Sequence, residues 1–257
     1  MKKFTKRLTM IVAVLLSLVL LSSSIVSTTL AKYVVTKGAS TTVGLNKFGL
    51  KVELEVNDGF STTETTKKGD TVEVTITGIK LVPGNDEAKY KNMITASITE
   101  TATVAANVKI EVSITADDNS DFNVLEDDFK GYTDCRYLPI GVCVAGSDVI
   151  TPYTKYASTD DIGAKVQAAV AEQIKNIVGT SGTNVSSAKL STDNKTITGT
   201  IAQNKEANVA NIGIGFYWPY TSDVTDSNEI GTWIAKNEPT FTVTYKITVE
   251  QTSDPTT

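Results

Sequence analysis

Residues 241–251 read FTVTYKITVEQ, and this stretch decides the fold class. Apolar side chains recur at every second position, and the positions between them hold threonine or lysine. Such alternation is typical of a β-strand with one face buried and the other in water. The pattern therefore predicts a strand near the end of the chain, in a sheet with one packed face.

The same period of two recurs along most of the chain. Further alternating runs lie at 50–56, 72–76, 108–114, 197–201 and 212–218. Six or more strands with polar outer faces predict an all-β, antiparallel β-sandwich of jelly-roll or immunoglobulin type. The spacing of cysteine and tryptophan that marks immunoglobulin domains is missing from the sequence, which favours the jelly-roll-like fold.

One segment has helical spacing instead. In STDDIGAKVQAAVAEQIKNIVGTSG, apolar residues from Ile162 to Ile177 recur with the period of an α-helix. We therefore expect one inserted amphipathic helix at about 160–178, packed on an edge of the sandwich. The residues suited to cap it are Ser158, Asp160 and Asp161 at its start and Gly179 at its end.

The first 31 residues have the features of an export leader. Basic residues precede an apolar run at 10–21, which is short for a membrane span. Small residues at Thr29 and Ala31 suit a signal peptidase site, so we expect cleavage after Ala31 and a secreted, extracellular protein. The alternative is that the leader remains as an N-terminal anchor.

Beyond the leader, the sequence predicts one domain with short flanking segments. Residues 32–48 form an extended N-terminal segment in this interpretation. Residues 49–251 form a single β-sandwich domain, in which 117–194 are an insertion that contains the helix. Residues 252–257 form a tail.

Composition narrows the classes of function. Without the four basic residues of the leader, 20 basic and 29 acidic residues remain, a formal charge of −9. This acidic balance argues against nucleic acid as a partner. Histidine, the commonest general base and metal ligand, is absent from the sequence. We therefore expect neither enzyme activity nor a cofactor, with a metallopeptidase as a less favoured alternative.

Two groups of residues suggest local sites. Cys135 and Cys143 have a spacing that suits a disulfide across a hairpin, with a reduced, buried pair as the alternative. Asp117, Asn119 and Asp121 weakly resemble the first ligands of a calcium loop. Phenylalanine stands at 122 where that loop requires glycine, so we prefer a solvated acidic loop and predict no metal site.

The most distinctive aromatic run is FYWPY at 216–220. Phe216 and Trp218 continue an alternating pattern, so we interpret them as core residues. In the alternative interpretation, Tyr217, Tyr220 and Trp233 form an exposed aromatic platform for a glycan or another subunit.

The order of several short motifs resembles the TasA/camelysin group of exported bacterial proteins. These motifs are TLAKY (29–33), KFGLKVE (47–53), LVPGN (81–85), ITETATVAANVKIEVSIT (98–115), FYWPY (216–220), IGTW (230–233) and FTVTYKITVEQ (241–251). The middle of the chain is not covered, and the spacing between LVPGN and the following strand differs from the family pattern.

The resemblance implies a jelly-roll subunit of extracellular fibres in a biofilm matrix. It also implies an ER-type signal peptidase that removes the leader, and assembly with further copies or a paralogous subunit. In such fibres, the N-terminal segment of one subunit lies as a donor strand in the next.

The residues after the leader are consistent with that role. Tyr33, Val34 and Val35 favour extended backbone, and the TKGASTTVG that follows lacks a tight two-residue hairpin signal. Such a segment can add to the sheet of another subunit. The alternatives are pairing within its own domain and, at the level of function, a monomeric surface adhesin or carbohydrate-binding β-sandwich.

Overall fold

The computed structural model describes residues 41–57, 64–80, 93–116, 135–138, 140–157, 159–218 and 240–252. All of them belong to one compact unit. The predicted leader, its cleavage site at Ala31 and the predicted tail from 253 onward lie outside the described residues. Within the described ranges, no helix has the length and apolarity that crossing a bilayer requires.

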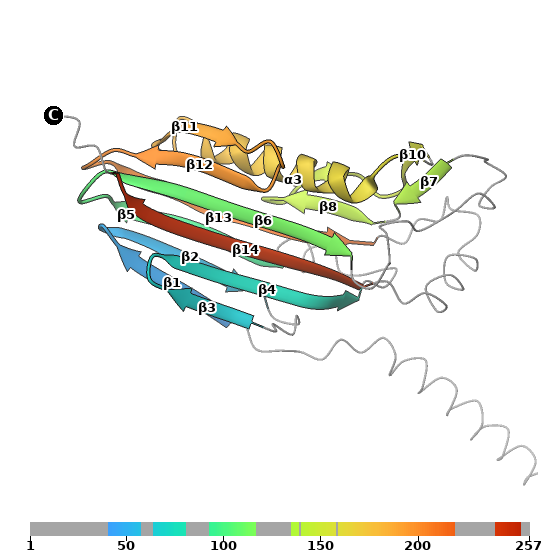
Figure 1. Ribbon diagram of the computed structural model, residues 1–257, viewed down its shortest axis with the longest axis horizontal. Helices are drawn as coiled ribbons and strands as arrows, with labels where there is room; N and C mark the ends of the chain where they lie inside the picture. Colours follow the sequence, from blue (N-terminus) through green and yellow to red (C-terminus); the bar gives the residue numbers. More distant parts are fainter. Residues whose placement is uncertain are drawn as a thin grey trace, which may run out of the picture. The chain divides into compact units, whose positions relative to one another are not determined.

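Most of the described chain forms two six-stranded antiparallel sheets (Figure 1). Sheet A contains, in spatial order, β1 (Thr41–Lys47), β2 (Leu50–Val56), β5 (Ile94–Thr101), β13 (Glu206–Tyr217), β8 (Gly141–Val144) and β9 (Ser147–Ile150). Sheet B contains β11 (Val185–Leu190), β12 (Thr196–Ile201), β6 (Ala106–Ala116), β14 (Thr240–Gln251), β4 (Thr71–Lys80) and β3 (Glu64–Lys68). A separate pair joins β10 (Thr154–Ala157) to β7 (Cys135–Leu138).

The strand pairing is that of a jelly roll. Strand β4 pairs with β14, β5 with β13, β6 with β12, and β8 with β9. The chain is therefore folded back on itself like a long hairpin, whose successive strand pairs alternate between the two sheets. This arrangement confirms the predicted all-β sandwich. Strands β1, β2, β3 and β11 extend the two sheets beyond these eight.

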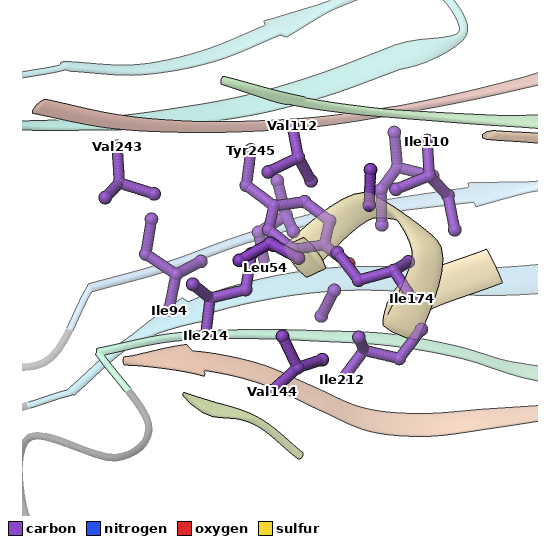
Figure 2. Close-up of a cluster of buried hydrophobic side chains, with 14 of the residues drawn as sticks. Leu54, Ile94, Ile110, Val112, Val144, Ile174, Ile212, Ile214, Val243 and Tyr245 are labelled. Carbon is purple, nitrogen blue, oxygen red and sulfur yellow. The ribbon is translucent and has the colours of Figure 1, made fainter. Parts of the chain in front are cut away.

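The predicted alternation places one face of each strand in a shared core. All six alternating runs form strands, and their apolar positions are buried. Figure 2 shows side chains from both sheets meeting between them: Val243 and Tyr245 of β14, Ile110 and Val112 of β6, and Leu54, Ile94, Val144, Ile212 and Ile214 of sheet A. The removal of these apolar side chains from water is the main force that holds the sheets together.

The predicted helix is also confirmed. Helix α3 spans Ile162–Val178, and its cap residues are Asp161 and Gly179. The Asp161 carboxylate accepts a hydrogen bond from the Ala164 N–H at 2.9 Å, which satisfies a backbone donor of the first turn. The helix contacts strands of both sheets, along the side of the sandwich opposite β1 and β3 (Figure 1). Its apolar stripe thus fills the space between the sheets at that side.

Three expectations differ from the structure. The cysteine-containing strands do not form a hairpin with each other, because β7 pairs with β10 whereas β8 pairs with β9 and β13. The range 117–194 is more than an insertion, since it supplies β8 and β9 to sheet A. The first described strand begins at Thr41, so part of the predicted N-terminal extended segment at 32–48 pairs within its own domain.

Candidate assembly edge

The sheet edges are the places where this fold could bind another strand. Among the described strands, β1 and β9 end sheet A, and β3 and β11 end sheet B. An edge strand presents a row of backbone N–H and C=O groups, and natural proteins usually protect it with charge, bulges or short length. The four edges differ in this protection.

Three of the edges carry recognisable protection. Strand β3 reads ETTKK, and all five of its residues are exposed. Strand β11 has a register shift between Ser186 and Lys189, and Ser187 has a φ of 57°. Strand β9 has four residues, and its pairing with β8 is also irregular. Charge, a bulge and short length, respectively, therefore disfavour the addition of a strand at these edges.

Strand β1 lacks these protections. Its pairing with β2 is continuous from Thr41 opposite Val56 to Lys47 opposite Leu50. The sequence TTVGLNK contains neither proline nor any charge before Lys47. Lys47 itself forms an ion pair with Asp70, at the turn between β3 and β4 of the other sheet. The charge at the end of β1 is thus directed across the sandwich.

A tight hairpin determines which backbone groups of β1 point outward. Phe48 and Gly49 join β1 to β2 with φ values of 54° and 79°, the signs that a type I′ turn requires. In such a hairpin the flanking residues, Lys47 and Leu50, form a hydrogen-bonded pair, and bonded and non-bonded pairs then alternate along the strands. The N–H and C=O groups of Thr42, Gly44 and Asn46 therefore point away from β2.

The hairpin is anchored to the rest of the domain. The Thr103 N–H donates to the Phe48 carbonyl at 2.7 Å. A Cβ atom at Gly49 would lie 2.3 Å from the Thr101 carbonyl oxygen, so only glycine fits there without movement of the backbone. These contacts hold β1 in place, which a preformed strand-binding edge requires.

The side chains of β1 separate into two faces. Leu45 is buried and Val43 is half-buried against the core, whereas Thr42 and Asn46 are exposed. A strand added beside β1 would continue this division, with apolar residues on the inner face and polar residues outside. The edge therefore favours an incoming strand that itself alternates or is rich in β-branched residues.

The described residues support a core role for the aromatic run at 216–218. Phe216, Tyr217 and Trp218 are all buried. The Tyr217 hydroxyl donates to the Asp148 carboxylate at 2.7 Å, and the indole N–H of Trp218 donates to the Tyr153 hydroxyl at 3.1 Å. The platform interpretation is therefore wrong for Tyr217, and its other members, Tyr220 and Trp233, lie outside the described residues.

Other predicted sites are only partly within the described chain. Cys143 is buried in β8, and its thiol donates to the Gly215 carbonyl at 3.5 Å. Cys135 is the first residue of β7. The disulfide stays a prediction. Tyr33, Val34 and Val35, and the calcium candidates Asp117, Asn119 and Asp121, lie outside the described residues. Within the described ranges, no cluster of three potential metal ligands occurs.

Some charged groups on the described surface form local ion pairs. Glu111 lies on the outer face of sheet B, and its carboxylate contacts Lys109 at 3.0 Å and Lys246 at 3.1 Å. Partial burial raises the pKa of Glu111, but the hydrogen bonds from both lysines outweigh this effect and hold the pKa below its usual value. The carboxylate therefore stays ionised in a structural role.

Comparison with known proteins adds no assignment. No protein-family model, curated protein or solved structure matches this chain. The resemblance to the TasA/camelysin group therefore stays a hypothesis that rests on the short motifs of the sequence. Among the described strands, none pairs with the outer edge of β1.

Proposed function

We propose that this chain is a secreted structural subunit of extracellular fibres or a biofilm matrix. In this proposal, the N-terminal segment that begins at Tyr33 adds as a strand to the sheet of a neighbouring copy. The observation that carries the proposal is the regular, uncharged outer edge of β1. Strand addition gains affinity from backbone hydrogen bonds and specificity from alternate side chains, and this edge offers both.

The position of the segment next to this edge limits how assembly can proceed. If residues 33–47 formed one straight strand, antiparallel pairing of two copies would be reciprocal and would close as a dimer. Growth of an open fibre requires the chain to change direction between the donor segment and β1. Gly38, in the sequence TKGAS, provides the backbone freedom for such a change.

Leader removal would act as the trigger for assembly. The leader joins directly to the donor segment at Ala31 and Lys32, so the uncleaved chain keeps this segment tethered. An ER-type signal peptidase would release it outside the cell. A high net negative charge before assembly would keep the released subunits soluble.

Deletion of residues 32–40 tests this proposal. The deletion must stop at Ser40, because Thr41 and Thr42 belong to β1. We expect the protein that begins at Lys32 to form filaments visible by electron microscopy, and the shortened protein to keep its circular dichroism spectrum without forming them. Removal of residues 253–257 is the control and should leave assembly unchanged. Filaments of normal length from the shortened protein would refute donor-strand assembly.

A further inference from the structure

The outer edge of β1 is complementary to itself. The outward-pointing backbone groups belong to Thr42, Gly44 and Asn46, which are placed symmetrically about Gly44. We propose that β1 pairs antiparallel with β1 of a second copy about a two-fold axis through Gly44, so that the two A sheets become continuous. This proposal uses only described residues and stands whether or not the N-terminal segment forms fibres.

The hydrogen-bond register favours this axis over neighbouring ones. In the antiparallel pair, Thr42 lies opposite Asn46 of the second copy, and the two Gly44 residues lie opposite each other. Each of these pairs can exchange both N–H···O=C bonds. A shift of the axis by one residue places one end of β1 opposite a residue outside this strand. Pairing centred on Gly44 therefore uses the whole of β1.

Side chains match in the same register. Val43 lies opposite Leu45 of the second copy on the inner face, and Thr42 lies opposite Asn46 on the outer face. The centre holds glycine, and the nearest side chain is that of Glu53, whose Cγ would lie 3.3 Å from a Cβ added at Gly44, so the end of this flexible side chain must move slightly when a residue is introduced there. Cross-strand pairs of like polarity are the stabilising unit of an antiparallel sheet.

The charges of the neighbouring strand do not oppose the contact. Gly44 lies opposite Glu53 of β2, and the Glu53 carboxylate is paired with Lys51 at 3.0 Å. In the dimer, the two β2 strands lie three strand spacings apart, roughly 14 Å. That separation exceeds the screening length of about 8 Å at physiological ionic strength, so repulsion between the Glu53 residues is weak.

The proposed contact is small, and the dimer should therefore be concentration-dependent. It buries one strand edge, far less surface than a permanent dimer interface requires. The same edge would receive the donor segment in the proposed fibre, so the two-fold pair and fibre growth exclude each other. The dimer would hold subunits in a closed, non-propagating form until the released segment replaces the second copy.

Disulfide trapping tests the two-fold register. The variant Gly44→Cys places two thiols opposite each other on the axis, within the Cα separation that a disulfide spans. The experiment uses the chain from Lys32 onward with Val34→Lys and Val35→Lys, so that strand addition does not compete. We expect Gly44→Cys to form several-fold more cross-linked dimer on mild oxidation than Thr66→Cys, an exposed position on the charged edge strand β3. The protein without added cysteine sets the background.

A second variant removes one backbone hydrogen-bond donor from the outer edge of β1. Thr42→Pro deletes an N–H that points away from β2, so the ladder within the domain should survive. We expect it to keep the fold by circular dichroism and to lose the reversible dimer in sedimentation velocity. Equal cross-linking of Gly44→Cys and Thr66→Cys, or an undiminished dimer in a folded Thr42→Pro protein, would overturn the two-fold pairing. Filament formation by the unmodified protein, measured separately, reports on the proposed function alone.

Discussion

Gln167 of helix α3 accepts a hydrogen bond from the backbone N–H of Ile114 at 3.0 Å. Its side-chain amide also donates to the carbonyl of Val112 at 2.9 Å. Strand β12 begins at Thr196, opposite Glu111, so β6 continues beyond the first residue of its neighbour at this point. The Gln167 amide supplies the donor and the acceptor that a further strand residue would provide. It thereby joins the helix to sheet B and satisfies buried backbone groups.

Replacement of Gln167 by leucine should therefore destabilise the domain. The change leaves the Ile114 N–H and the Val112 carbonyl buried without this partner, at a cost of roughly 2–4 kcal/mol in the free energy of unfolding. Urea unfolding measures the loss. The control is Gln173→Leu, the same chemical change at a half-buried position of the same helix. An equal loss of stability in both variants would show that the hydrogen bonds of the Gln167 amide do not stabilise the domain.

Two glycines with positive φ should respond very differently to alanine. Gly49 has a φ of 79°, and an added Cβ would lie 2.3 Å from the Thr101 carbonyl oxygen. Gly69 has a φ of 58°, but an added Cβ there would meet nothing within 4 Å. We expect Gly69→Ala to cost about 1 kcal/mol from backbone strain alone. Gly49→Ala should cost ~3 kcal/mol or more, because the backbone must also move.

Thermal unfolding of the two variants measures this difference. The comparison tests whether β1 is held in a fixed position, because Gly49 lies in the turn that orients the outer edge of β1. If Gly49→Ala were as stable as Gly69→Ala, the hairpin would not be tightly anchored at Thr101. The proposed assembly edge would then lack a fixed geometry.

Tyr245 places a hydroxyl in the centre of the core. Its side chain is fully buried among apolar residues such as Leu54 and Ile174 (Figure 2), and the described residues provide no hydrogen-bond partner for the hydroxyl. Tyr245→Phe should therefore be neutral or stabilise the domain by up to about 2 kcal/mol. The control is Tyr217→Phe, which loses the bond to Asp148 and should destabilise by about 1 kcal/mol. If Tyr245→Phe destabilised the domain by more than Tyr217→Phe does, the Tyr245 hydroxyl would have a hydrogen-bond partner.

Tyr245 also predicts how stability changes at alkaline pH. Burial raises the pKa of Tyr245 above its ordinary value of 10.0. Above about pH 10, the unfolded chain releases this proton while the folded chain keeps it, so stability falls as pH rises, by up to about 1.4 kcal/mol per pH unit. Tyr245→Phe should flatten this decline in urea unfolding between pH 9 and 11. A slope unchanged by the substitution would mean that Tyr245 ionises equally easily in both states.

The local pattern of apolar and polar residues was sufficient to predict many of the strands and the helix. Alternation identified β2, β4, β6, β12, β13 and β14, and helical spacing identified α3 with its caps at Asp161 and Gly179. These features depend on residues that are neighbours in the chain, because a half-buried strand or helix must show its own period in the sequence.

The proposed assembly edge at β1 was harder to predict from the sequence. Val43 and Leu45 do alternate with polar or small residues, but the turn that follows is Phe48-Gly49 and not one of the usual pairs such as Asn-Gly. Phenylalanine is a poor residue for positive φ. The contact of its carbonyl with the Thr103 N–H favours that conformation, and this contact comes from a segment 55 residues further along the chain.

The sequence by itself determined that this chain forms half-buried strands, one capped helix and a mainly apolar interior. Only the tertiary structure decided that β14 lies between β4 and β6, that Cys135 and Cys143 belong to strands in different sheets, and that β1 is the outermost described strand of sheet A. The physical reason is that periodicity records which face of an element is buried. It does not record the neighbour that buries it, because many strands of similar pattern compete for each position and only the packing of the whole chain selects among them.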